Sequence, residues 1–163
     1  SLHYVPRDNH RCTVTLLSGL PGAGKDTWLS ANRVGLPVVA LDAIRSEMEI
    51  DATDNQGEVI QRAREQCRAH QGANRTFAPN ATTIPRQMRQ RWIELFSDYD
   101  TRIEIVYLEP PLATILARNR LRANPVPEKV IRHLVEKLEP PTITECHDLV
   151  LDECPHVKPT IPV

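Results

Sequence analysis

The 163-residue sequence predicts an α/β fold in three layers, with a mostly parallel central sheet of about five strands. Short apolar runs typical of buried strands alternate along the chain with longer segments of helical periodicity. A glycine-rich stretch, Gly19 to Gly24, stands between the first apolar run and the first helical segment. Strand, glycine loop and helix in that order are the context that a phosphate-binding loop requires.

The first half of the chain contains two of the predicted strands. The elements expected there are a strand over 12–18, a helix from 28 to about 33–35, a strand over 37–41, and helices over 43–48 and 58–71. Gly35 is the C-cap signal of the first helix, and Asp42 is placed to cap the second. Helical spacing predicts that the third helix buries Val59, Ile60, Ala63 and Cys67.

The second half contains the remaining strands and a broken helical region. The elements expected there are a weak strand over 75–78, a turn over 79–83, a helix starting at Pro85, a strand over 102–108, helices over 112–120 and 128–138, and a strand over 147–152. The helix after Pro85 is expected to bury Met88, Trp92, Ile93 and Phe96. We expect a single domain over 12–154, with a lead-in or linker remnant before it (1–11) and a tail after it (155–163).

The glycine loop has the chemistry of a phosphate cradle. Backbone N–H groups of Gly22, Ala23 and Gly24 can point at phosphate oxygens, and Lys25 can reach the β- and γ-phosphates of a nucleotide. The pattern departs from the usual one because Asp26 stands where Ser or Thr ordinarily binds magnesium, and Thr27 follows one place later. A glycine-rich turn without a ligand is the alternative, which the flanking strand and helix disfavour.

Several polar residues directly follow predicted strands, where the ligand site of a parallel sheet is expected. These are Gly19, Asp42, Asn80 and Glu109, and we expect them to converge. An acidic metal or water anchor is often found after the third strand, but the chain has Asn80 there. We therefore hypothesise that Asp26 supplies the missing carboxylate as the Mg²⁺ ligand.

Asp42 and Arg45 are the candidate acceptor-side residues. A positioned Asp can take the proton of an acceptor hydroxyl, although a helix cap is an equally good reading of Asp42 from position alone. Arg45 lies one helical turn further and could hold a phosphate near that base, or it is simply a surface arginine.

A second arginine cluster begins a predicted lid over about 118–138. Arg118 and Arg122 are four residues apart, which predicts that they share one helix face. A helix–loop–helix that closes over phosphates with arginines neutralises charge on a transferring phosphoryl group. A solvated helix end is the alternative reading.

Charge and composition limit the classes of function. The net charge of −1 argues against a non-specific nucleic-acid binder. Residues 61–132 nevertheless carry thirteen basic and seven acidic side chains, and sixteen of the twenty basic residues of the chain are Arg. Arginine suits phosphate recognition, so this distribution indicates a local site that binds phosphate. Ordinary solvated helix faces explain part of the excess of positive charge.

The cellular setting is inferred from cysteines and hydropathy. The four cysteines, Cys12, Cys67, Cys146 and Cys154, form no CxxC pair, which favours reduced thiols over disulfides or zinc. No apolar run is long enough to span a membrane, and the first eleven residues are polar, so we expect no membrane association and a cytoplasmic location.

Taken together, these segments resemble the 5′-hydroxyl polynucleotide kinase family, in its phage type and its bacterial RNA-repair relatives. The resemblance runs from about Thr13 to Pro141 and implies a three-layer P-loop kinase fold with a helical lid. It is carried by five segments: Gly19–Trp28, Asp42–Arg45, Asn80–Arg89, Ile103–Leu108, and Arg118–Arg122 followed by Val126-Pro127.

The resemblance implies a role for each matching residue. Lys25 would bind the β- and γ-phosphates, Asp42 would be the general base, and Arg45 would contact the 3′-phosphate of the acceptor. Arg122 would be the lid arginine at the transferring phosphate with Arg118 in support, and Val126 and Val130 would pack on the terminal acceptor base. It also implies Mg²⁺ and neighbouring repair domains.

The sequence is therefore interpreted as a magnesium-dependent kinase that moves the γ-phosphate of ATP or another NTP to 5′-OH ends of RNA or DNA, in nucleic-acid repair. One alternative is a small-molecule kinase for a sugar, an antibiotic or a nucleoside, and only seven aromatic residues are available for base stacking. Another is a non-catalytic nucleotide-binding module in which Asp26 marks a decayed metal site.

Overall fold

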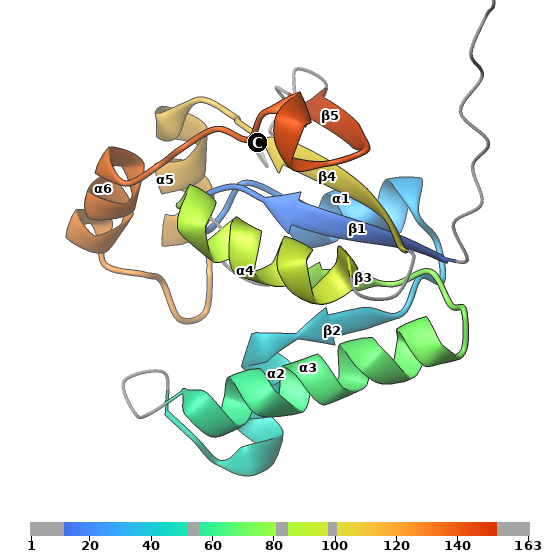
Figure 1. The fold of residues 1–163 in the computed structure, drawn as a ribbon. Helices are drawn as coiled ribbons and strands as arrows, with labels where there is room; N and C mark the ends of the chain where they lie inside the picture. The colour runs from blue at the N-terminus through green and yellow to red at the C-terminus, as the bar shows by residue number, and fades with distance from the viewer. Residues whose placement is uncertain (1–11, 52–55, 81–84, 98–100, 153–163) are drawn as a thin grey trace, which may run out of the picture.

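The computed structural model describes residues 12–51, 56–80, 85–97 and 101–152, and it confirms the predicted α/β fold (Figure 1). In chain order the elements are β1 (Cys12–Ser18), α1 (Lys25–Asn32), β2 (Val38–Ala40), α2 (Leu41–Met48), α3 (Gly57–Gly72), β3 (Ala78–Asn80), α4 (Arg86–Ser97), β4 (Thr101–Leu108), α5 (Leu112–Arg120), α6 (Glu128–Glu136), the 3₁₀ turn η1 (Ile143–Glu145) and β5 (Asp148–Asp152).

The strands form two parallel groups, β1-β4-β5 and β2-β3. Phe77, directly before β3, joins the two groups. Its N–H donates to the carbonyl of Thr13 at 3.3 Å, and its carbonyl accepts from the N–H of Thr15 at 3.0 Å. The resulting order is β2-β3-β1-β4-β5, so the carboxyl ends of the strands lie along one edge of the sheet.

Helices cover the sheet on both faces and form the three layers. On one face, Val14, Leu16, Ile103 and Ile105 of the sheet pack with apolar side chains from α2, α3 and α4, and α4 crosses the front of β1 in Figure 1. On the other face, Leu17, Val106 and Leu108 pack with Leu29 of α1. These alternate strand residues are almost all fully buried, which explains the nearly continuous apolar strand sequences.

A third, smaller apolar cluster belongs to the lid, defined here as α5, α6 and the loop 121–127 between them. Leu20 of the glycine loop packs there with Ile115, Leu116 and Ile131. The lid is thus attached to the phosphate-binding loop through side-chain packing.

Two predictions of buried side chains are wrong. Met88 is 43% exposed and Ile60 is 37% exposed, whereas Arg89 is fully buried within α4. Arg89 takes the inner position because its Nε donates to Glu145 Oε1 at 2.9 Å, which supplies the charge partner that burial of a guanidinium requires.

Local details also differ from the sequence-based expectation. β3 includes Pro79, where a turn was predicted because proline cannot donate to a ladder. Asp42 lies inside the first turn of α2, whose N-cap is Ala40, because the helix begins directly after β2. Gly35 follows the C-cap Arg33 instead of forming it, although its φ of +74° still suits glycine.

Some expectations fall on residues that the structure does not describe. The lead-in (1–11), the tail (155–163), Cys154 and most of the predicted turn over 79–83 lie outside the described residues. Within the described ranges, the helices lack the combination of length and apolar character needed to cross a bilayer.

Candidate active site

A cleft of about 450 Å³ opens where β1, β2 and β3 end. It is lined by the phosphate-binding loop, the start of α2, the end of β3 and the lid, through Pro21, Gly22, Gly24, Lys25, Asp26, Thr27, Leu41, Asp42, Arg45, Asn80, Arg118, Arg122 and Val126. Most of the residues selected from the sequence are therefore neighbours in space.

The backbone of the glycine loop requires glycine at two positions in particular. Gly19 has φ +153°, and a Cβ added there would lie 2.8 Å from the carbonyl oxygen of Leu108. Gly24 is the N-cap of α1 in a left-handed conformation, with φ +95°. The loop therefore turns tightly and places the N-terminus of α1 at the cleft, where its free N–H groups favour an anion.

Lys25 lies over this loop at the start of α1. Its Nζ donates to the carbonyl of Gly19 at 3.2 Å. Burial lowers the pKa of Lys25, while the nearby carboxylates of Asp26 and Asp42 raise it and Arg122 lowers it further. These three charged groups from three elements thus surround the Lys25 ammonium, which is the arrangement expected of a phosphate-binding lysine.

Asp26 and Asn80 meet across the cleft. The Asn80 side-chain amide donates to Asp26 Oδ1 at 2.9 Å, which brings together the start of α1 and the end of β3. A carboxylate and an amide oxygen beside a phosphate site fit Mg²⁺, which is commonly held by one or two carboxylates and by substrate phosphates. Among the residues that the structure describes, no group of three or more His, Cys, Asp or Glu side chains is arranged so that it could hold a metal ion.

Asp42 and Arg45 form an ion pair on the first turns of α2. The Asp42 side chain is 94% exposed, whereas that of Arg45 is 23% exposed. Gln56, just before α3, holds Arg45 from the other side by accepting from its Nε at 2.6 Å, and donates in turn to the carbonyl of Asp51 at 2.9 Å. The carboxylate of Asp42 and the guanidinium of Arg45 therefore lie together on the wall of the cleft that α2 forms, where they supply a base and a cation.

The lid contributes two arginines. Arg118 donates to the carbonyls of Gly22 at 3.4 Å and Ala23 at 3.3 Å, so it crosses the phosphate-binding loop. Arg122 lines the cleft but lies beyond the end of α5, so the two arginines do not share a helix face as predicted. The helix ends at Arg120, where the N–H groups of Leu121 and Arg122 bond three residues back.

Two other residues selected from the sequence are not among the lining residues of the cleft. Val126 lines the cleft, whereas Val130 is not among its lining residues and is 38% exposed on α6. Glu109 follows β4 but lines a separate hollow with Tyr107 and Leu20, so it does not join the convergent group.

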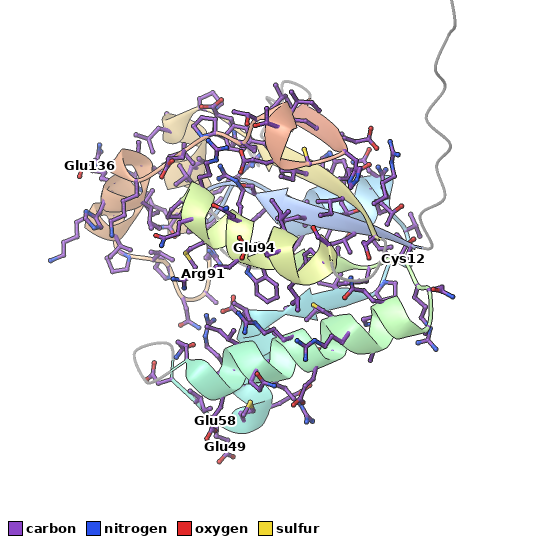
Figure 2. All side chains as sticks on the ribbon, viewed as in Figure 1. Cys12, Glu49, Glu58, Arg91, Glu94 and Glu136 are labelled. Atoms are coloured by element: carbon purple, nitrogen blue, oxygen red, sulfur yellow. The ribbon has the colours of Figure 1, made fainter. Side chains whose placement is uncertain are left out.

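Most of the arginine-rich middle of the chain lies away from the cleft. Arg91 and Glu94 are exposed on α4 (Figure 2), and Arg62 pairs weakly with Glu65 on α3. Arg118 and Arg122 are the members of this segment that line the cleft within the described ranges. Solvated helix faces therefore account for much of the local positive charge.

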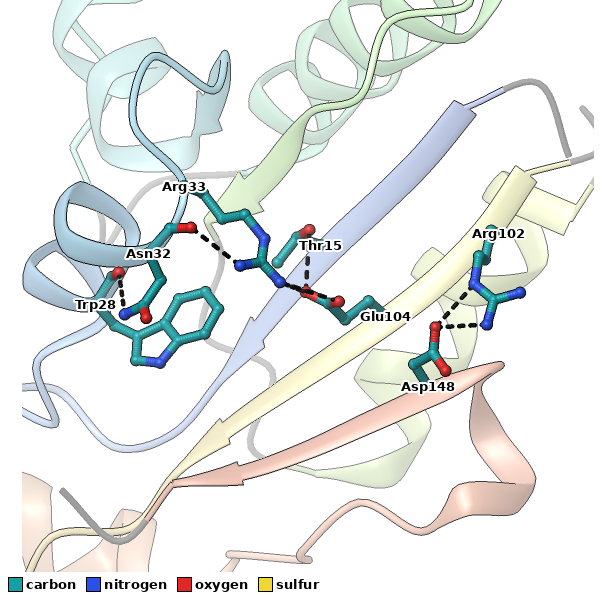
Figure 3. A network of polar contacts seen from close by, with 7 residues as sticks. All are labelled: Thr15, Trp28, Asn32, Arg33, Arg102, Glu104 and Asp148. Carbon is teal, nitrogen blue, oxygen red and sulfur yellow. Dashed lines mark hydrogen bonds and ion pairs between the residues drawn. The ribbon is translucent and has the colours of Figure 1, made fainter. Parts of the chain in front are cut away.

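The far end of α1 is fixed to the sheet by a polar network (Figure 3). Arg33 donates to Glu104 at 2.9 Å, and its guanidinium lies 5.2 Å from the ring centroid of Trp28. Thr15 also donates to Glu104. This anchor fixes the direction of α1, and hence of its N-terminus at the cleft.

The sequence analysis missed two supporting residues, Gln56 and Asn119. Asn119 is buried and bonds to both the N–H and the carbonyl of Val126. Polar residues are common before a helix and near a helix end. From the sequence alone, Gln56 and Asn119 therefore look like ordinary cap or turn residues.

Comparisons with known proteins agree with this geometry. A family model described as an AAA domain matches residues 14–141. A sugar kinase from Janibacter sp. HTCC2649 is 18% identical, with 86% of this chain and 84% of that chain covered and a TM-score of 0.64. The APS kinase CysC of Mycobacterium tuberculosis, solved with AMPPNP and APS, is 14% identical, with coverage of 87% and 89% and a TM-score of 0.59.

A chain of the Pnkp1/Rnl/Hen1 RNA repair complex is also similar. It is 16% identical and has a TM-score of 0.69, with 80% of this chain covered. This chain spans 45% of the length of that relative. The chain belongs to the AAA-domain family and has the α/β fold of P-loop kinases.

Proposed function

We propose that the chain is a kinase that transfers the γ-phosphoryl group of ATP or another NTP to the 5′-hydroxyl end of RNA or DNA, in nucleic-acid repair. The observation that carries the proposal is the Asp42–Arg45 pair, which faces the same cleft as the phosphate-binding loop. It combines a base for a hydroxyl with a cation for a second phosphate, and a polynucleotide end offers both groups.

In the proposed reaction, the 5′-oxygen of the acceptor forms a bond to the γ-phosphorus, and the bond from that phosphorus to the bridging oxygen breaks. The nucleoside diphosphate leaves with that electron pair, and the hydroxyl proton passes to the carboxylate of Asp42. The exposure of Asp42 leaves room for an acceptor to approach. A phosphate bound to Arg45 would draw the guanidinium away from Asp42 and leave the carboxylate to the hydroxyl.

The donor would be held by the loop and the lid. Backbone N–H groups of Gly22, Ala23 and Gly24 would bind phosphate oxygens, and Lys25 would bind the β- and γ-phosphates. Arg122 would neutralise charge on the transferring phosphoryl group. Arg118, which lies against Gly22 and Ala23, would support it.

Asp26 and Asn80 would hold Mg²⁺ beside the phosphates, and Thr27 lies next to them on the cleft wall. When bound, the ion would act as a Lewis acid that reduces the negative charge of the phosphates. The carboxylate of Asp26 would then replace the one missing after β3, so the charge of the site is conserved.

A small-molecule kinase is the second candidate, and the cleft itself favours it in one respect. No aromatic side chain is among the described residues that line the cleft. The nucleobase of a polynucleotide acceptor would therefore pack on the aliphatic side chain of Val126 instead of stacking on an aromatic ring. The similar chains described as sugar and APS kinases act on small acceptors, whereas the RNA-repair relative supports a polynucleotide and partner repair domains.

The proposal is tested by transfer of labelled γ-phosphate from ATP, with Mg²⁺, to an oligonucleotide with a 5′-OH end. The matched control is the same oligonucleotide with a 5′-phosphate, and the matched variant is Asp42→Ala. We expect label on the 5′-OH strand alone and its loss in the variant. ATP binding without label on that strand would contradict the proposal and lead to a panel of sugars and nucleosides.

A further inference from the structure

We infer that Asn119 is a positioning residue that holds the lid loop so that Arg122 faces the terminal phosphate of the bound nucleotide. The inference rests on the proposed function for the role of Arg122, and it assigns a role to Asn119, for which no role was predicted from the sequence. It begins with the loop 121–127, which carries two lining residues of the cleft, Arg122 and Val126.

The loop has little packing of its own. Residues 121–125 are all exposed, and the side chain of Leu121 is 87% exposed. Packing against the rest of the protein therefore does not fix the path of the loop, and its hydrogen bonds gain importance.

Asn119 holds this loop at both ends. Its backbone carbonyl accepts from the N–H of Arg122 at 3.1 Å. Its side-chain Nδ2 donates to the carbonyl of Val126 at 2.6 Å, and its Oδ1 accepts from the N–H of Val126 at 2.9 Å. One residue therefore contacts the backbone of both lining residues.

The chemistry of the contact explains the residue type. A planar amide offers one donor and one acceptor side by side, which matches the N–H and carbonyl of a single residue in an extended loop. Asn119 is 2% exposed, so loss of the amide would leave two backbone groups of Val126 poorly satisfied. The loop would then lose its fixed path, and the Arg122 side chain would sample positions away from the phosphate.

A purely structural role is the alternative, and the neighbouring residue provides the control. Arg120 also joins α5 to α6, because its guanidinium donates to Glu128 at 2.8 Å and 3.0 Å. This pair is largely exposed, and neither residue lines the cleft. Arg120→Ala therefore removes the ion pair between the two lid helices but leaves the hydrogen bonds from Asn119 to the backbone of Arg122 and Val126 in place.

The experiment measures the dissociation constants of ATP and ADP, with Mg²⁺, for the wild type and for Asn119→Ala, Arg122→Ala, the double variant and Arg120→Ala. The preference for ATP over ADP reports contact with the γ-phosphate and needs no acceptor. We expect Arg122→Ala to reduce this preference about tenfold. Asn119→Ala should remove most of the same preference, and the double variant should match Arg122→Ala within about twofold.

Four results would overturn the inference. The first three are no preference for ATP in the wild type, an unchanged preference in Asn119→Ala, and losses that multiply in the double variant. The fourth is an equal loss in Arg120→Ala, because it would indicate general damage to the lid. Asn119→Ser, a milder change, gives the same comparison if the alanine variant does not fold. Failure of the labelled 5′-OH transfer would contradict the proposed acceptor but would leave this nucleotide measurement unaffected.

Discussion

The two sides of the cleft are built in different ways. The proposed donor side consists of the phosphate-binding loop, whose path is fixed by left-handed glycines, by fully buried Ala23 and by the carbonyl contacts of Arg118. The proposed acceptor side consists of side chains on the eight-residue helix α2, with Asp42 almost fully exposed and Arg45 held by the side chains of Asp42 and Gln56.

The difference indicates which side can change. A substitution on the donor side must fit a backbone that tolerates few residues. A substitution of Asp42 on the acceptor side changes an exposed side chain at a small cost in stability. We therefore propose that specificity for the acceptor resides in α2 and the lid.

The largest effect is expected from the donor side. Lys25→Met should lower kcat/KM by at least about 10³-fold for every acceptor, because it removes the charge that binds the β- and γ-phosphates. The thermal midpoint should not fall, since burial already disfavours the charged form of Lys25 and lowers its pKa. The exposed Lys129→Met is the control in a steady-state transfer assay, and equal activity of the two variants would contradict the donor assignment.

The next effect tests whether the two sides are separable. Asp42→Asn should lower kcat about 10²–10³-fold through loss of the base, with the dissociation constant of ATP unchanged within about twofold. Single-turnover rates and nucleotide titrations measure the two quantities. Glu47→Gln, an exposed change in the same helix, is the control. A matching loss of ATP affinity would mean that Asp42 belongs to the donor side.

The metal site tests the boundary between the two sides. Asp26→Asn should abolish magnesium-dependent transfer, a loss of more than about 10²-fold, because it removes the carboxylate beside the phosphates. The double change Asp26→Asn with Asn80→Asp returns one carboxylate to the same hydrogen-bonded pair and should recover part of the rate. Near-normal turnover of Asp26→Asn, measured against Mg²⁺ concentration, would refute the hypothesis.

The smallest effect on activity is expected from the buried pair outside the cleft. Glu145→Gln removes the buried ion pair between Arg89 and Glu145 and should lower the free energy of unfolding by about 3 kcal/mol, with KM values unchanged. Burial would raise the pKa of Glu145, but hydrogen bonds from Arg89 and Thr142 hold it below its usual value. This stabilisation is therefore complete above the ordinary Glu pKa and is lost as pH falls below it.

Chemical denaturation at pH 7 and at pH 3.5 measures this contribution. The wild type should lose more stability than Glu145→Gln between the two pH values, because the variant has no carboxylate to protonate there. Parallel losses in both proteins would show that another group causes the acid sensitivity.

The sequence predicted the elements that have strong local signals. The helix over 112–120 matches α5 at both ends, because Pro111 and an apolar repeat mark it clearly. The Asp26–Asn80 contact was also foreseeable, since both residues stand at the carboxyl edge of the sheet. Periodicity could not distinguish Met88 from Arg89, because the partner of Arg89 lies 56 residues away in η1.

The supporting contacts of the site depend on tertiary structure. Gln56 reaches Arg45 only because α3 starts beside α2, and Asn119 meets Val126 only because the lid loop folds back. β3 accepts Pro79 for a similar reason, since strands on both sides of it override the local preference for a turn. Residue type and spacing therefore predict side chains that would contact the substrate. They do not predict the residues, such as Gln56 and Asn119, that position those side chains.

The most direct test of the account asks whether the acceptor side reads a phosphate. The measurement is kcat/KM for a nucleoside 3′-phosphate and for the same nucleoside without phosphate, in the wild type and in Arg45→Met. The account predicts that the wild type prefers the phosphorylated acceptor about 10–100-fold, and that Arg45→Met loses this preference while the KM for ATP stays constant. Equal use of both nucleosides by the wild type, or an unchanged preference in Arg45→Met, would contradict it.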